Sequence, residues 1–332
     1  MNRFQHVLVI GGAGYVGAVL VPKMLEAGYR VTVFDLFIYG EDVFDAVKTN
    51  PHLKLVKGDM RNEAAVAEAM KGCDAVIHLA CISNDPSFEL DPELGKSINL
   101  DSFRPTVKAA KKAGVKRFIY ASSSSVYGVK EGVEVTEDLS LEPLTDYSKF
   151  KVACEQILTE ERTPGFVTTI IRPATVCGYS PRQRLDVIVN ILTNHAYHNN
   201  KIKIMGGAQL RPNIHIQDMA RIYLAALELP DEKVDGACFN AGYENHSVQQ
   251  LAEMVQRVVG PQVQMEVVPT DDPRSYHVSS EAIKKAWGFA PAHSIEDASR
   301  ELLTAFKAGK LPNAMANPMY FNIKRMQELK LK

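Results

Sequence analysis

Cysteine is scarce in this sequence, and the cysteines present are far apart. They are Cys73, Cys81, Cys154, Cys177 and Cys238. Their number is odd and no two form a Cys-x-x-Cys pair, so the pattern excludes a disulfide framework and a cysteine metal site. It is typical of free thiols in a reducing compartment. The residues before the first apolar segment, 1–6, show no signal peptide. We therefore expect a cytoplasmic protein.

Net charge and long apolar runs are also missing. The formal net charge of the 332 residues is -1, so no global basic surface is present to attract nucleic acid. No apolar run approaches the ~20 residues that a membrane-spanning helix needs. Hydrophobic residues make up 46% of the chain and charged residues 23%. This composition suits one or two soluble domains with a well-developed core.

A glycine-rich turn near the N-terminus organises the chain. Four apolar residues, 7–10, predict a buried strand, and glycines at 11, 12, 14 and 17 follow it. Glycine lets the backbone turn tightly and approach a pyrophosphate, whose charge is favoured at a helix N-terminus. A second strand, 30–35, ends in Asp35, 18 residues after Gly17. A carboxylate that binds a ribose stands at about this place in the dinucleotide fingerprint.

Strands and helices alternate through the first half of the chain. Further strands are expected at 53–57, 74–80, 116–121 and 167–171, and helices at 17–27, 41–49, 63–71, 93–113 and 146–161. We expect Pro105 to start, kink or break the helix at 93–113. The alternation predicts an α/β fold with a doubly wound parallel sheet, which binds ligands at the carboxyl ends of its strands.

The second half of the chain has a looser pattern. Helices are expected at 185–197, 217–229, 247–259 and 295–307, and strands at 201–205 and 263–268, with no assignment after Leu311. We place a soft, interleaved boundary at residue 178. It separates a dinucleotide-binding Rossmann domain, 1–178, from a smaller, mainly substrate-binding α/β region, 179–332.

A tyrosine and a lysine four residues apart carry the expected chemistry. Tyr147 and Lys151 share one face of the helix predicted at 146–161. An unperturbed tyrosine has a pKa of about 10 and is a poor base, but a lysine ammonium and a nicotinamide cation nearby favour the phenolate. Tyr147 then removes a hydroxyl proton while a hydride leaves the same carbon. A tyrosine and a lysine at this spacing are common by chance. Here they follow a cofactor fingerprint and a serine cluster, 122–125, in the sequence, and this combination is specific for the proposed chemistry.

In this order the motifs resemble the extended short-chain dehydrogenase/reductase family, in its branch of nucleotide-sugar epimerases, dehydratases and 4-dehydrogenases. The matching segments are 11–17, 58–59, 78–80, Asn99, 122–128, Tyr147 with Lys151, 172–173, 211–218 and 272–274. The resemblance covers residues 6 to about 290. It implies a Rossmann-type fold, a nucleoside-diphosphate sugar substrate and a homodimer. The two partners of that dimer would pair through the helix that carries Tyr147 and the helix ending near Ala113.

The resemblance also implies a role for each matching residue. Tyr147 would be the catalytic base, Lys151 would hold the nicotinamide ribose, and Ser123 would be the catalytic hydroxyl. Asp35 implies NAD rather than NADP, since a carboxylate there repels a 2′-phosphate. The implied cofactor-binding residues are Gly11, Gly14, Tyr15, Val16, Gly17, Asp35, Asp59, Met60, Leu79, Ala80, Cys81, Asn99, Ser122, Tyr147, Lys151 and Pro173.

On the substrate side, Arg211 and Arg274 match arginines that bind the diphosphate, a role that suits a guanidinium fork. The segment 178–186 is similar to that of a subgroup acting on GDP-linked sugars, including heptoses. The expected substrate-binding residues are Ser83, Ser124, Arg182, Arg184, Asn190, Arg211 and Arg274. For Arg182 and Arg184, solvated loop arginines are an even alternative. No metal site is expected, because His195 and His198 lack a third ligand.

The two residues after Ser123 separate the possible activities. Dehydratases of this family carry an Asp-Glu pair there, and this chain carries Ser124 and Ser125. Elimination of water then lacks its acid and base, which disfavours a 4,6-dehydratase. The leading hypothesis is an NAD-dependent 4-epimerase of a nucleoside-diphosphate sugar. The alternative is a 4-dehydrogenase or 4-ketoreductase with net redox change. A non-catalytic dinucleotide-binding regulator needs none of the catalytic residues and is disfavoured.

Overall fold

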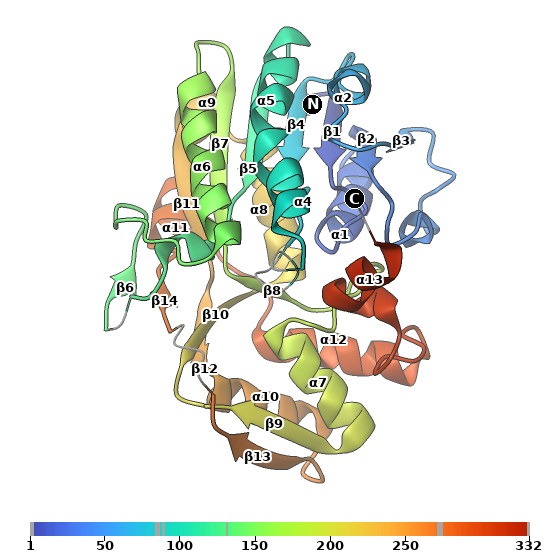
Figure 1. The fold of residues 1–332 in the computed structure, drawn as a ribbon, viewed down its shortest axis with the longest axis vertical. Coiled ribbons are helices and arrows are strands. Elements are labelled where there is room, and N and C mark those ends of the chain that lie inside the picture. Colours follow the sequence, from blue (N-terminus) through green and yellow to red (C-terminus); the bar gives the residue numbers. More distant parts are fainter. Residues whose placement is uncertain (1–2, 84–86, 88–89, 131, 271–274, 331–332) are drawn as a thin grey trace.

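A parallel sheet of seven strands, in the order β11-β7-β5-β4-β1-β2-β3, forms the centre of the molecule (Figure 1). The computed structural model describes residues 3–83, 87, 90–130, 132–270 and 275–330. The strands of this sheet are β1 (His6–Ile10), β2 (Arg30–Asp35), β3 (Leu53–Lys57), β4 (Ala75–His78), β5 (Arg117–Ala121), β7 (Val167–Pro173) and β11 (Ala237–Ala241). All neighbours pair in parallel, and the predicted Rossmann-type α/β fold is confirmed.

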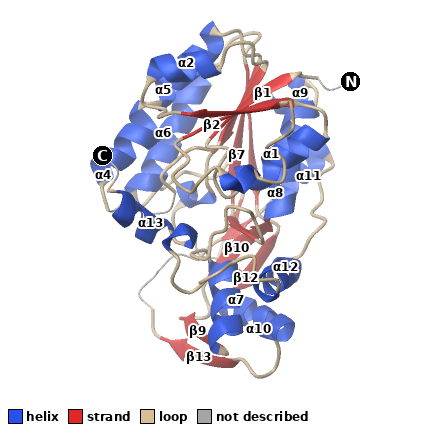
Figure 2. Ribbon diagram, turned by 90° about the vertical axis from the view of Figure 1, so that its right-hand side faces the viewer, coloured by secondary structure: helices blue, strands red, loops and turns tan. Residues whose placement is uncertain are grey.

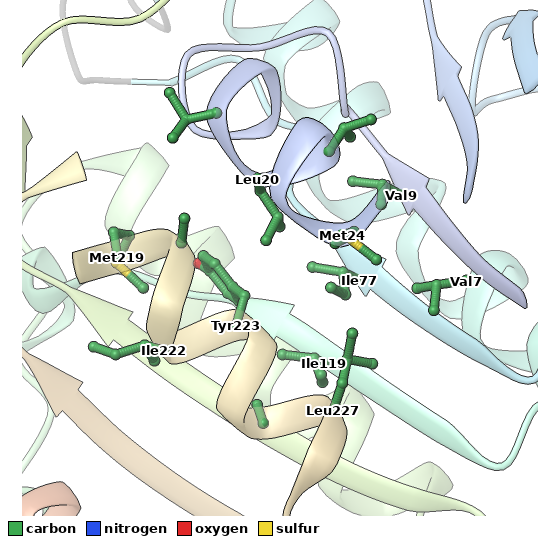
Figure 3. Packing of buried hydrophobic residues seen from close by; sticks show 14 of the residues in the cluster. Val7, Val9, Leu20, Met24, Ile77, Ile119, Met219, Ile222, Tyr223 and Leu227 are labelled. Carbon is green, nitrogen blue, oxygen red and sulfur yellow. The ribbon is translucent and has the colours of Figure 1, made fainter. Parts of the chain in front are cut away.

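Helices cover both faces of the sheet because its strands are apolar on both sides. In β1, Val7 and Val9 belong to one core and Leu8 and Ile10 to the other. The first core lies under α1 (Gly17–Glu26), α8 (Ile216–Glu228) and α11 (Glu281–Trp287), and the second under α2 (Glu63–Ala69), α5 (Phe103–Lys112) and α6 (Asp146–Glu161). Figure 3 shows the first core, with side chains of α1 and α8 lying over β1, β4 and β5.

A second lobe lies beyond the carboxyl ends of these strands and occupies the lower part of Figures 1 and 2. Its strands are β8 (Thr175–Cys177), β10 (Leu210–His215) and β12 (Glu244–Ser247) in one sheet, and β9 (Lys201–Met205) with β13 (Gln264–Val268) in another. Its helices are α7 (Ile188–Asn199), α10 (Val248–Val259) and α12 (Ile295–Lys307). Because α8, β11 and α11 return to the large sheet, the chain passes between the two lobes repeatedly after residue 178.

Two predicted helices differ from the structure. The segment 93–113 is divided into α4 (Pro92–Lys96), a π-helical turn (Ser97–Asp101) and α5. Pro105 lies in the first turn of α5, where its missing N–H costs no hydrogen bond, so the break falls before it. The helix predicted at 41–49 was wrong. That segment forms only a 3-10 turn (Asp42–Phe44), because Val43 and Phe44 are buried within one turn and so short a helix nucleates poorly.

The sequence analysis assigned no element to several segments that are regular in the structure. These include the strands β8, β10, β11 and β12 and the helix α11. They also include β6 (Glu134–Val135), which pairs with β14 (His277–Val278), and the helices α9 (Asp231–Val234) and α13 (Asn322–Leu329). The five cysteines are free thiols. Within the described ranges, no helix is long and apolar enough to cross a membrane.

Candidate active site

The glycine turn connects β1 to α1 at the carboxyl edge of the sheet. Gly11 has φ +77, and a Cβ at this position would lie 2.5 Å from the Cα of Ala80. A Cβ on Gly17 would lie 2.2 Å from the carbonyl oxygen of Gly12. Within the described chain, no side chain caps the start of α1. The backbone therefore comes close to this edge and offers helix N–H groups to an anion, which fits the pyrophosphate of a dinucleotide.

Asp35 ends the neighbouring strand, β2. Its carboxylate accepts hydrogen bonds from the backbone N–H of Ala13, at 3.0 Å, and of Phe37, at 2.8 Å. Burial raises the pKa of Asp35 above its ordinary value although these bonds act in the opposite direction. Beyond β3, Asp59 forms a 2.6 Å ion pair with Arg61, whose hydrogen bonds lower the pKa of Asp59. The two carboxylates line the side of the edge that fits the adenosine half of NAD.

Replacing Asp35 with serine is expected to lower the preference of the protein for NAD over NADP by about tenfold or more, which corresponds to about 1.4 kcal/mol. The substitution removes the negative charge that repels a 2′-phosphate, and the positive charge of Arg182, which acts on Asp35, remains. Fluorescence titration of the cofactor-free protein with each nucleotide measures the ratio. Asp59→Asn is the control, since it should weaken both nucleotides alike. Unchanged exclusion of NADP by Asp35→Ser would contradict the assignment.

The expected catalytic residues come from the end of β5 and the start of α6. Tyr147 lies in the first turn of α6, which is fixed by a capping box between Thr145 and Ser148. Lys151 is buried, and its Nζ donates to the carbonyl of Ala121 at 2.7 Å and lies 5.8 Å from the centre of the Tyr147 ring. The bond ties α6 to β5 two residues before Ser123. The hydroxyl of Ser123 lies 2.9 Å from that of Ser125.

A buried ion pair behind these residues was missed by the sequence analysis. Arg172 of β7 binds Glu155 of α6 through two hydrogen bonds, of 2.7 and 3.0 Å, and each side chain is 7% exposed. Ser122 donates its hydroxyl to the same carboxylate. Burial lowers the pKa of Arg172, but the hydrogen bonds and the negative charge of Glu155 raise it, and the pKa lies above its ordinary value. Glu155 stands four residues after Lys151, so the helical spacing could have indicated it.

Several of the expected cofactor residues lie in the loop after β4 or hold it, whereas Pro173 is the last residue of β7. The side chain of Asn99 binds both the N–H and the carbonyl of Ile82, at 2.8 and 3.0 Å, and so fixes the loop after β4. Leu79, Ala80 and Cys81 belong to the start of that loop. Burial lowers the pKa of His78, just before the loop, to about 3. This imidazole therefore stays neutral near pH 7 and is unsuited to general-acid catalysis there.

Tyr15 and Asn190 connect the glycine turn to the second lobe. The hydroxyl of Tyr15 donates to the carbonyl of Gly178 at 2.6 Å and accepts from the amide of Asn190 at 2.9 Å. Asn190 is fully buried and also accepts from the N–H of Gly178 at 3.0 Å and donates to the carbonyl of Arg184 at 2.7 Å. These bonds fix the position of the segment after β8 relative to the cofactor turn.

Arg182 and Arg184 are held by protein groups rather than left in solvent. Arg182 is 4% exposed, and Arg184 binds Asp186 at 2.8 Å. Arg211 lies near the start of β10, paired with His246 of β12. Ser124 is buried next to Ser123. Arg274 lies outside the described residues. Among those that are described, no cluster of three or more His, Cys, Asp or Glu side chains could hold a metal ion.

A parallel sheet with a glycine turn after the first strand, an acid after the second, and a Ser/Tyr/Lys set at its carboxyl edge defines an enzyme of the short-chain dehydrogenase/reductase class. The family model described as the NAD dependent epimerase/dehydratase family matches residues 7–242, and the chain belongs to this family. NAD is the cofactor of the family.

Named relatives and solved structures match most of the chain. UDP-glucose 4-epimerase of Corynebacterium glutamicum is 29% identical over 316 residues, with 89% of this chain and 94% of that protein covered. Human sterol-4-alpha-carboxylate 3-dehydrogenase, decarboxylating, is 32% identical, with 62% of this chain and 52% of that protein covered. Among solved structures, dTDP-glucose 4,6-dehydratase DesIV of Streptomyces venezuelae, with NAD and TYD bound, superposes with a TM-score of 0.84 at 22% identity, covering 94% of this chain and 100% of that one. The resemblance to enzymes of GDP-linked heptoses stays a prediction.

Proposed function

We propose that this protein is an NAD-dependent 4-epimerase of a nucleoside-diphosphate sugar, with a UDP-hexose as the first substrate to test. The observation that carries the proposal is the bond from Lys151 to the carbonyl of Ala121, at 2.7 Å, which ties the helix of Tyr147 to the strand before Ser123. Two relatives, which cover 89% and 91% of this chain, are named UDP-glucose 4-epimerase. Serine at 124 and 125 leaves the chain without the carboxylates that a dehydratase uses after the catalytic hydroxyl.

In this proposal NAD, when bound, supplies the acceptor and later the donor of the hydride at C4 of the sugar. The Ser123 hydroxyl hydrogen-bonds the C4 oxygen and fixes its position. Tyr147 takes the proton of the C4 hydroxyl as the hydride leaves, and returns it to the same oxygen when the hydride comes back to the other face of the sugar. The Lys151 ammonium keeps a positive charge near the Tyr147 ring and favours its phenolate.

The substrate side of the proposal rests on two arginines and two serines that the family resemblance implies. Arg211 of β10 and Arg274 would bind the diphosphate through their guanidinium groups. Ser83 and Ser124 would contact the sugar. Arg182, Arg184 and Asn190 already have partners in the protein, so we propose that they act chiefly by shaping the segment after β8.

Incubation of the purified protein with UDP-glucose, without added cofactor, tests the function. We expect UDP-galactose to accumulate to a fixed equilibrium ratio, measured by chromatography or NMR, because the NAD is regenerated in each cycle. A panel of GDP- and dTDP-sugars assigns the nucleotide. Strict dependence on an external oxidant, with stoichiometric formation of reduced nicotinamide, would refute the epimerase and support the dehydrogenase alternative. The similarity to a sterol dehydrogenase over 62% of this chain is the observation that favours the dehydrogenase alternative.

We also propose a homodimer formed through α5 and α6. Three apolar positions of α6 do not support it, because Leu158 is fully buried in the chain's own core, and Ile157 and Val152 pack against its own clusters. The proposal therefore rests on the family resemblance, and light scattering of the purified protein decides it.

A further inference from the structure

The segment after Leu311, which the sequence left unassigned, joins the two lobes. Leu311 and Ala314 are buried in one cluster with Phe306 of α12. The N–H of Leu185 donates to the carbonyl of Tyr320 at 2.9 Å. The chain then enters α13, which Figure 1 shows between the second lobe and the side of the large sheet that carries β2. The segment is thus anchored to the second lobe before it reaches the cofactor side.

Asn322, the first residue of α13, contacts three separate loops. Its side-chain oxygen accepts hydrogen bonds from the Tyr39 hydroxyl, at 3.0 Å, and from Nη2 of Arg182, at 2.5 Å. Its side-chain amide donates to Ser83 at 2.8 Å, and its backbone N–H donates to Asp186 at 2.9 Å. Asn322 is 4% exposed. A single buried amide therefore connects the loops that follow β2, β4 and β8.

These loops are the ones that face the expected cofactor and substrate. Tyr39 stands four residues after Asp35, Ser83 belongs to the loop after β4, and Asp186 binds Arg184. Further along α13, Nε of Arg325 donates to the carbonyl of Ile38 at 2.7 Å. Met326 is buried in the core that includes Phe34 and Met60. Three residues of α13 thus hold it against the adenosine side of the cofactor site.

Arg182 places a buried positive charge beside Asn322 and Tyr39. Its guanidinium carbon lies 3.5 Å from the centre of the Tyr39 ring, and its positive charge acts on Asp35. Within the described residues, its buried Nε has no hydrogen-bond partner. A buried cation of this kind depends on the few partners it has. Because Asn322 is one of them, loss of its side chain should release the loop after β2 together with Arg182.

We infer that Asn322 is a positioning residue that latches α13 across the loops after β2, β4 and β8, and that the closed latch keeps NAD on the protein between turnovers. Asn322 acts through Tyr39, Ser83 and Arg182 and not on the reacting atoms. The inference rests on the proposed function in one respect. An epimerase returns the hydride to the sugar it came from, so it has no need to exchange its NAD, whereas a dehydrogenase must.

The rate of NAD release tests the latch. The purified protein is transferred to cofactor-free buffer, and the NAD that remains bound is extracted and quantified over time. Asn322→Ala leaves buried partners without a hydrogen bond, so we expect NAD release to be faster by about tenfold or more. Asn322→Asp keeps an acceptor for Tyr39 and Arg182, and the Ser83 hydroxyl can donate to its second carboxylate oxygen, so this variant should release NAD more slowly than Asn322→Ala. With saturating NAD, kcat should fall by a smaller factor than the rate of NAD release rises, because Asn322 does not touch the reacting atoms.

Gln327→Ala is the matched control, since Gln327 is exposed on the same helix, and it should release NAD at the wild-type rate. Thermal unfolding of all variants shows whether each is folded. The latch is refuted if folded Asn322→Ala retains NAD as long as the wild type does. It is also refuted if the wild type itself loses its NAD as fast as we expect for Asn322→Ala. Failure of the proposed function looks different. No UDP-sugar would be epimerised by any variant, while the difference in NAD release would persist.

Discussion

Tyr147→Phe is expected to lower kcat for epimerisation by about 10²–10⁴-fold, the range that a positioned general acid–base group contributes. The substitution removes only the phenolic oxygen. The ring remains near the Lys151 ammonium, 5.8 Å away in the wild type, and the capping box that starts α6 is untouched. Initial rates with UDP-glucose, at saturating substrate, measure the effect.

The bound NAD of Tyr147→Phe should remain at the wild-type level, which separates lost proton transfer from a lost cofactor. Tyr197→Phe is the matched control, because Tyr197 lies in the second lobe, where its ring stacks on Phe306. Ser123→Ala should also lower kcat, since the C4 oxygen then loses a hydrogen bond. An unchanged rate for Tyr147→Phe with every active nucleotide sugar would remove the mechanism and revive the reading of a dinucleotide-binding regulator.

The parts of the fold that the sequence predicted are those whose signals are local. The strands β1 and β2, the glycine turn and the helix α6 each have a run of apolar residues, a cap or a turn residue within a few positions. For α6, the bounds Asp146–Glu161 coincide with the prediction, because Thr145 caps it and good helix formers fill it. The edge of the sheet that carries the expected site followed from the alternation of strands and helices alone.

The parts that escaped prediction depend on distant partners. The strands β8, β10 and β12 have three to six residues each and pair with one another across 30 residues or more, so no local pattern marks them. In the sequence, Asn322 cannot be distinguished from other polar residues near the C-terminus. Its role is visible only from its hydrogen bonds to Tyr39, Ser83 and Arg182. Sequence spacing places residues on one helix face, but it does not show which loop a tail will meet.

The Glu155–Arg172 pair is where a single substitution should cost the most stability. Glu155→Leu is expected to lower the free energy of unfolding by about 3–5 kcal/mol, because it leaves a buried guanidinium without its counter-charge. Both side chains are 7% exposed. Arg172 also donates to the hydroxyl of Tyr127 at 2.6 Å, so the loss extends to a buried tyrosine. Urea unfolding measures the difference.

The double variant Glu155→Leu with Arg172→Met separates the interaction energy of the two side chains from the contribution that each makes with its other neighbours. Since apolar residues can replace a buried ion pair at little cost, the double variant should be more stable than either single one, which a double-mutant cycle reports as a coupling energy. Lys149→Gln is the control on the same helix. Its pair with Asp146 is 54% and 53% exposed, and its loss should cost less than about 1 kcal/mol. If Glu155→Leu costs no more than Lys149→Gln, the buried pair does not hold α6 to β7. The positions of Ser122 and Lys151, and with them the proton transfer at Tyr147, must then depend on the other contacts of α6, such as the bond from Lys151 to Ala121 and the burial of Cys154 and Leu158.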